Sequence, residues 1–195
     1  RDTDRSRGLG DVYKRQMRRM ILEKEPNDGH RTIAGLEDEF DVTIITQNGD
    51  DFHERAGSTK VIHLHGEALK NASTLHPYES YEIDRNNPDI HIGDKAPDGS
   101  QIRPYVIYFN EDIEQRLWKA SVEATKQADV FIVVGSTMLV YPAAELLKMI
   151  PPKCELYIID PSEVTLPEGC TKEYIHIQSG ASRGLEQLKA TLKLK

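Results

Sequence analysis

Short apolar runs alternate with amphipathic stretches along most of the chain. The runs have the length and the β-branched or aromatic content of strands, and they cover residues 42–46, 60–64, 105–109, 130–134, 156–159 and 174–177. Between them, apolar residues recur at helical spacing over residues 28–39, 111–127, 142–150 and 182–194. Strands that alternate with helices predict a parallel, doubly wound sheet, that is, a Rossmann-like α/β fold.

Two segments depart from this alternation. Residues 67–103 are polar and contain turn signals, which predicts a small subdomain inserted into the larger domain. Residues 1–16 are charged and without an apolar pattern, so we expect a non-native or disordered leader, with natural sequence beginning near Met17. The expected division is therefore a leader at 1–16, a Rossmann-like domain of 17–66 and 104–195, and a subdomain of 67–103.

Composition narrows the range of partners. The 195 residues carry a net charge of −7, which argues against attraction to nucleic acid or to an anionic membrane surface. No run approaches the roughly 18 apolar residues that a membrane span needs. The spacing of Cys154 and Cys170 fits neither a zinc knuckle nor a redox pair, so we expect ordinary thiols and a reducing, cytoplasmic setting.

The richest chemistry follows the first predicted strand. Residues 46–66, from the run TQNGDDFHERAG to Leu64-His65-Gly66, contain an amide pair, an acidic pair and three histidines. Ligand sites in open α/β sheets form at the carboxyl ends of the strands, so these side chains lie where chemistry is expected.

Spacing alone leaves the histidines open to three interpretations. His63 and His65 are two residues apart in a predicted strand, so their rings should point to one face, as in a metal half-site. Asp50 and His53 could complete such a site, and the protein would then be a metal-dependent hydrolase. Alternatively, a histidine acts as a general base, or the histidines are structural.

A second candidate site follows two later strands. Gly135, Ser136 and Thr137 end a buried strand before a helix, where free N–H groups and hydroxyls suit a ribose or a phosphate. Asp160 ends the next strand and could accept hydrogen bonds from ribose hydroxyls. An ordinary strand–helix turn at 135–137 and a turn begun by Asp160 are the alternatives. No GxGxxG motif occurs, which counts against an ordinary dehydrogenase.

Taken in order, these segments resemble the sirtuins, the Sir2 family of NAD-dependent protein lysine deacylases. TQNGDDFHERAG is similar to the family's TQN-[IV]-D-x-L-H-x-x-AG block, and HLHGE to its LHG block. IRPYVIYFNE, VGSTMLVYPAAEL and YIID are similar to three later blocks. The likeness covers roughly residues 25 to 190.

The resemblance implies NAD as cofactor, an acylated lysine peptide as substrate, and transfer of the acyl group to ADP-ribose with release of nicotinamide. It makes His65 the catalytic base, which draws a proton from a ribose hydroxyl. The implied NAD-binding residues are Gln47, Asn48, Asp50, Gly135, Ser136, Thr137, Asp160 and Ala181. The implied peptide-binding residues, which would pair with the substrate as an added strand, are Val106, Phe109, Asn110 and Val140.

The sequence also departs from the family's pattern. The opening GAGxSxxSGIPDFR block is absent, so we expect a fragment with little turnover by itself. Gly49 replaces a branched aliphatic residue of the nicotinamide pocket, and Tyr105, Tyr108 and Asn110 replace His, Trp and Gly of the peptide-binding strand. The zinc-binding cysteines are absent from 67–103, which indicates a zinc-free subdomain. A sirtuin-like domain that binds nucleotide or peptide without turnover is therefore the second hypothesis.

Overall fold

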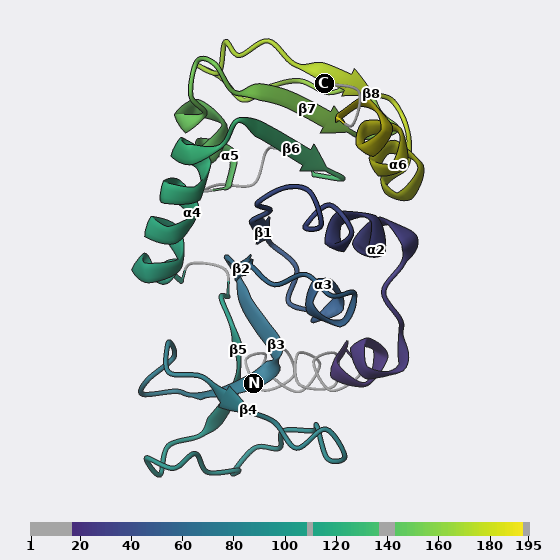
Figure 1. The fold of residues 1–195 in the computed structure, drawn as a ribbon. Coiled ribbons are helices and arrows are strands. Elements are labelled where there is room, and N and C mark those ends of the chain that lie inside the picture. The colour runs from purple at the N-terminus through teal and green to yellow at the C-terminus, as the bar shows by residue number, and fades with distance from the viewer. Residues whose placement is uncertain (1–16, 109–110, 137–142, 193–195) are drawn as a thin grey trace.

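The computed structural model describes residues 17–108, 111–136 and 143–192 of the chain (Figure 1). Its strands are β1 (Ile44–Thr46), β2 (Val61–His63), β3 (Gly66–Ser73), β4 (Tyr81–Glu82), β5 (Ile102–Val106), β6 (Val130–Val134), β7 (Glu155–Ile159) and β8 (Ile175–Ile177). Residues 17–23 are helical, and the further helices are α2 (Asp28–Ala34), α3 (Phe52–Arg55), α4 (Gln115–Gln127), α5 (Ala143–Leu146), the 3₁₀ helix η1 (Leu147–Met149) and α6 (Ala181–Leu192).

The C-terminal half is a three-layer unit built on the parallel strands β6, β7 and β8, in that order (Figure 1). Side chains alternate between the two faces of a strand, and both faces of β7 are buried. Leu156 and Ile158 pack with η1 on one face, whereas Tyr157 and Ile159 pack against α6 on the other. An apolar run buried on both faces is typical of a doubly wound parallel sheet, as the sequence predicted.

Close packing of α6 on β7 depends on Gly184. A Cβ atom at Gly184 would lie 2.3 Å from Cγ2 of Ile159, a distance at which one of the two elements must move. The first turn of α6 also meets α2, because the N–H of Gly29 donates to Oγ of Ser182 over 3.1 Å.

Strands β1 and β2 form a separate parallel pair in which Thr46 lies opposite His63. Both are shorter than the apolar runs that predicted them. β2 ends at His63, because the chain turns at Leu64 and His65 before β3 begins. This early end of β2 changes the interpretation of the two histidines, as described below.

The remaining sheet is antiparallel, with strand order β4-β3-β5. The sequence predicted a strand of the parallel sheet at 105–109, but the strand covers Ile102–Val106 and pairs with β3. No local pattern encodes the partner of a strand, and here the two strands at the ends of the polar segment pair with each other. Gly66 permits this pairing: its φ is +77°, and a Cβ atom there would lie 2.3 Å from the carbonyl oxygen of Tyr105.

Arg18 fastens the helix at 17–23 to this antiparallel sheet. Its guanidinium donates to the carbonyl oxygens of Ala68 at 2.6 Å, Pro88 at 2.9 Å and Lys70 at 2.8 Å, and to Oδ1 of Asn71. Burial lowers the pKa of Arg18 to about 10, so the side chain remains a cation at neutral pH. The charge is compensated by carbonyl dipoles rather than by a bonded carboxylate.

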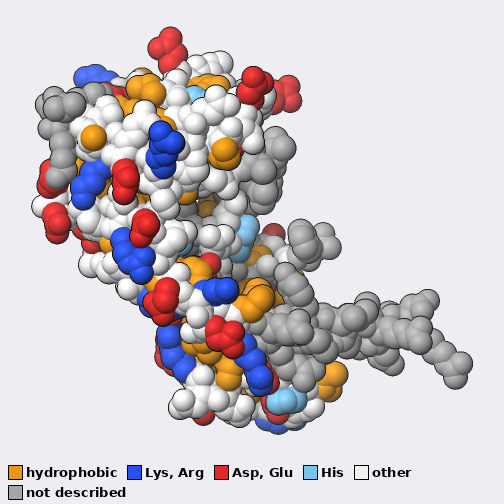
Figure 2. All heavy atoms as spheres, turned by 90° about the vertical axis from the view of Figure 1, so that its right-hand side faces the viewer, with side chains coloured by type: hydrophobic (Ala, Val, Ile, Leu, Met, Phe, Trp, Pro, Cys, Tyr) orange, Lys and Arg blue, Asp and Glu red, His pale blue; other side chains and the backbone are white. Residues whose placement is uncertain are grey.

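The surface carries mixed charge. On the face shown in Figure 2, basic and acidic side chains are interspersed among the described residues, without a continuous basic track. In the part of the chain that the structure describes, every helix is too short or too polar to cross a membrane.

Candidate functional site

The loop that follows β1, residues 47–51, is held by its backbone. The N–H of Asn48 donates to Oγ1 of Thr46 at 3.1 Å, and the carbonyl of Gly49 accepts from the N–H of Ala68 at 2.7 Å. At the far end, Oδ1 of Asp50 accepts from the N–H of Phe52 and forms a turn just before α3. We refer to residues 47–51 as the ribose loop.

This anchoring leaves the amide side chains of the ribose loop available. Nε2 of Gln47 is buried and has no hydrogen-bond partner, and the side chain of Asn48 is exposed. A buried amide N–H without a partner costs free energy, so it marks a position where a ligand acceptor fits. Gly49 approaches β3 closely, since a Cβ atom at Gly49 would lie 3.3 Å from the nitrogen of Ala68.

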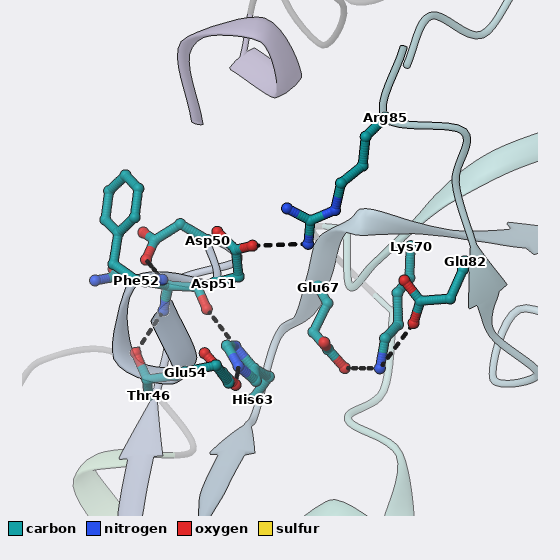
Figure 3. Close-up of polar contacts among 11 residues, drawn as sticks. Thr46, Asp50, Asp51, Phe52, Glu54, His63, Glu67, Lys70, Glu82 and Arg85 are labelled. Carbon is teal, nitrogen blue, oxygen red and sulfur yellow. Dashed lines mark hydrogen bonds and ion pairs between the residues drawn. The ribbon is translucent and has the colours of Figure 1, made fainter. Parts of the chain in front are cut away.

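His63 lies beneath the ribose loop and is buried. Its Nδ1 lies 3.0 Å from the carbonyl oxygen of Asn48, and its Nε2 lies 2.7 Å from Oε1 of Glu54 (Figure 3). Burial alone would lower the pKa of His63, but the hydrogen bonds with Glu54 and Asn48 and the charges of Glu54 and Glu67 together outweigh burial and raise it. The sequence did not single out Glu54, although it lies inside the same motif.

His65 has a different environment. It lies in the turn after β2, its ring is half-buried, and its carbonyl oxygen accepts from the N–H of Ile107 at 2.9 Å. Burial lowers the pKa of His65, and a hydrogen bond with the backbone of Gln47 offsets only part of this effect. The ring is therefore neutral at pH 7 and able to accept a proton.

These positions contradict the predicted metal half-site. The prediction of one shared face assumed a strand through 65, but β2 ends at His63, and both nitrogens of that ring are already bonded. Within the described ranges, no group of three or more His, Cys, Asp or Glu side chains could hold a metal ion.

His53 and His30 form a pair that the sequence did not predict. Their ring centroids are 4.7 Å apart at an interplanar angle of 66°, which joins α2 to α3. His53 is buried and its Nδ1 has no hydrogen-bond partner. Burial lowers the pKa of both rings, so both are neutral at pH 7. His53 therefore packs against another histidine.

The second predicted cluster lies at the carboxyl edge of the parallel sheet. Gly135 follows β6 with φ +58°, and its N–H donates to the carbonyl of Ile159, beside Asp160. Asp160 begins a turn, since its Oδ1 accepts from the N–H of Ser162 at 2.8 Å. Ala181 is exposed at the start of α6. Ser136 follows Gly135, whereas Thr137 lies outside the described residues.

Of the predicted peptide-binding residues, the structure describes Val106. It ends β5 opposite Gly66, the residue after His65, so it lies beside the predicted base. Phe109, Asn110 and Val140 lie outside the described residues. Arg103 on β5 donates two hydrogen bonds to the carboxylate of Glu111, both at 2.7 Å.

A cavity of about 670 Å³ lies elsewhere, between η1 and the segment before β8. Both cysteines line it, and both are free thiols. None of the predicted site residues borders this cavity. The predicted ligand-binding groups instead lie at strand ends, as expected for an open α/β sheet.

Comparison with known proteins decides the family. The profile of the Sir2 family matches residues 3–142. The chain belongs to the Sir2 family. An NAD-dependent protein deacylase of Bacteroides thetaiotaomicron is 42% identical to this sirtuin over 179 residues, which are 90% of the chain and 74% of the relative. One from Helicobacter pylori is 42% identical over 146 residues, which are 75% of the chain and 62% of the relative.

Solved sirtuin structures share the fold. A Sir2 homologue mutant in complex with 2′-O-acetyl ADP ribose matches with a TM-score of 0.81 at 29% identity, over 94% of this chain and 73% of that one. A Sir2 complex with a p53 peptide and NAD⁺ matches with a TM-score of 0.71 at 26% identity, over 90% of this chain and 73% of that one. The predicted family and the predicted Rossmann-like α/β class are confirmed.

Proposed function

We propose that this sirtuin is an NAD-dependent protein lysine deacylase, with the ribose loop and His65 as its reaction centre. The observation that carries the proposal is the contrast within this centre. The backbone of the ribose loop is hydrogen-bonded at Asn48 and Gly49, whereas the side-chain nitrogen of Gln47 is buried without a partner next to a neutral His65. Relatives named NAD-dependent protein deacylases support the same cofactor and reaction.

The residues divide the work between the two ends of NAD. Gln47, Asn48 and Asp50 would hold the nicotinamide ribose, because amides and a carboxylate suit its hydroxyls. Gly135, Ser136, Asp160 and Ala181 would hold the adenosine half at the carboxyl edge of the parallel sheet, with Thr137 beside them. Bound NAD would supply the ribose carbon that the acyl-lysine carbonyl oxygen attacks, with nicotinamide as the leaving group.

His65 would then act as the general base. Its lowered pKa keeps the ring unprotonated at neutral pH, as acceptance of a proton from a ribose hydroxyl requires. Val106 lies directly beside it in β5 and would pair with the backbone of the acylated peptide, together with Phe109, Asn110 and Val140. Two free cysteines agree with a cytoplasmic setting, which is part of the proposal.

Incubation with NAD and an acetyl-lysine peptide tests the proposal. Formation of nicotinamide and of the deacylated peptide is measured with the 195-residue chain and with a form preceded by the family's GAG block. We expect release that requires both substrates and is lost in His65→Ala. Release by His65→Ala at the unmodified rate would contradict the role of His65.

A second candidate function is binding without turnover. The residue at position 49 favours it. Gly49 presents no aliphatic side chain toward a ligand, and a Cβ atom there would lie only 3.3 Å from the nitrogen of Ala68. Calorimetry that detects NAD binding in both forms, while neither releases nicotinamide, would support the binding function.

A further inference from the structure

His63 lies between two hydrogen-bond acceptors. Its Nδ1 faces the carbonyl oxygen of Asn48 and its Nε2 faces the carboxylate of Glu54, at 3.0 Å and 2.7 Å (Figure 3). A carbonyl oxygen can only accept, and so can an ionised carboxylate. Both bonds therefore form only when each ring nitrogen carries a proton, which makes the ring of His63 an imidazolium.

The surrounding charges favour this state. Burial raises the pKa of Glu54, but the hydrogen bonds with His63 and with its own backbone and the nearby histidines together outweigh burial and lower it, so Glu54 stays ionised. Glu67, on β3, adds a second negative charge that raises the pKa of His63. His53, on α3, is the other titratable group nearby, and burial lowers its pKa so that its ring stays neutral. His63 is thus the cation among these residues.

The Asn48 carbonyl is one of three points that fix the ribose loop. Thr46 holds the N–H of Asn48, Ala68 holds the next carbonyl, and His63 holds the carbonyl between them. With the peptide plane after Asn48 fixed on both sides, the direction of the Asn48 side chain is fixed as well. A bond from a charged donor is the strongest of the three.

We propose that His63 is a positioning residue of this sirtuin: as an imidazolium paired with Glu54, it holds the Asn48 carbonyl and so orients the ribose loop toward NAD. The identity of the ligand rests on the proposed function, whereas the state of the ring and its effect on the loop do not. His63 does not itself touch NAD in this account.

Two near-isosteric variants separate positioning from simple packing. His63→Asn keeps an N–H donor close to the place of Nδ1, whereas His63→Leu has a similar size and no donor. We expect His63→Leu to weaken NAD binding by roughly tenfold, and His63→Asn by much less. A purely structural role predicts the reverse order, because a buried leucine stabilises this position at least as well as a buried asparagine.

The ring itself is tested by nitrogen NMR of the 195-residue chain. We expect both His63 nitrogens to be protonated at pH 7, and Glu54→Gln to move the titration midpoint down by roughly one to three pH units. Glu25→Gln is the matched control, since Glu25 pairs with Arg55 of α3, whereas the partner of the His63 ring is Glu54.

The results separate this inference from the proposed function. A neutral His63 ring at pH 7, or amide resonances of Asn48 and Gly49 that do not move in His63→Leu, would overturn the inference. If the unmodified chain bound no NAD, that result would count against the proposed function. The ring protonation and the Asn48 and Gly49 resonances would still decide the role of His63.

Discussion

His63 and His65 are two residues apart, yet their environments shift their pKa values in opposite directions. For His63, the hydrogen bonds with Glu54 and the Asn48 carbonyl and the nearby carboxylate charges together outweigh burial and raise the pKa, whereas burial lowers the pKa of His65. The end of β2 between them produces this difference, because it places the rings in separate surroundings. One short segment thus carries one ring whose surroundings favour the protonated form and one whose surroundings favour the neutral form.

The lowered pKa of His65 predicts the acid limb of the pH–rate profile. The base must be unprotonated, so kcat/KM for the acylated peptide should stay level as the pH falls from 8 to 6.5. It should decline only below the ordinary histidine pKa of 6.5. Initial rates of nicotinamide release between pH 5 and 8 measure this, and a decline that begins above pH 7 would refute it.

The raised pKa of His63 predicts a pH-dependent part of the stability. A group whose pKa is raised on folding stabilises fully below its unfolded pKa, near 6.5, and this contribution disappears as the pH rises through the folded value. The free energy of unfolding of the unmodified chain should therefore fall, relative to that of His63→Leu, as the pH rises from 6 to 9. Urea unfolding at each pH measures it, and a difference independent of pH would contradict the charged state.

Gly66 provides a stability test of the turn that places His65. Gly66→Ala should destabilise the chain by about 2 kcal/mol or more, because the new Cβ meets the Tyr105 carbonyl at a positive φ. Gly99→Ala is the control: its φ is also positive but nothing lies within 4 Å, so a loss of about 1 kcal/mol is expected. Equal losses in the two variants would show that the contact does not matter.

Arg18 and its neighbour Arg19 form a second matched pair. Arg18→Met leaves three acceptors on β3 and the carbonyl oxygen of Pro88 without their donor, so we expect a loss of about 3 kcal/mol or more in the free energy of unfolding. Arg19 is exposed and pairs with Asp89, so Arg19→Met should leave stability nearly unchanged. Thermal and urea unfolding compare them; similar losses would argue against the buried role of Arg18.

Much of the fold could be predicted because its strands are buried on both faces. The runs that became β6 and β7 are apolar throughout, and this pattern indicates a covered parallel sheet. The antiparallel pairing of β5 with β3 could not be predicted, because strand partners are chosen by contacts distant in the sequence. The short length of β2 was missed for a related reason, since the turn at His65 depends on the approach of Gly66 to Tyr105.

The candidate site was predicted in part. Its position after β1 followed from the general location of ligands in α/β sheets. The role of His65 came from the resemblance to sirtuins, because spacing alone left a metal half-site, a general base and structural histidines open. The bond between Glu54 and His63 joins α3 to β2, and the pair of His30 and His53 joins α2 to α3, so neither is visible in a local pattern.

The most direct test of the account is the release of nicotinamide from NAD in the presence of an acetyl-lysine peptide. It is measured for the unmodified sequence, His65→Ala and the exposed-histidine control His76→Ala, each with and without the GAG block in front. We predict release in at least one unmodified form, retained in His76→Ala and reduced by about 10²-fold or more in His65→Ala. No release from either unmodified form, or equal release by His65→Ala, would contradict it.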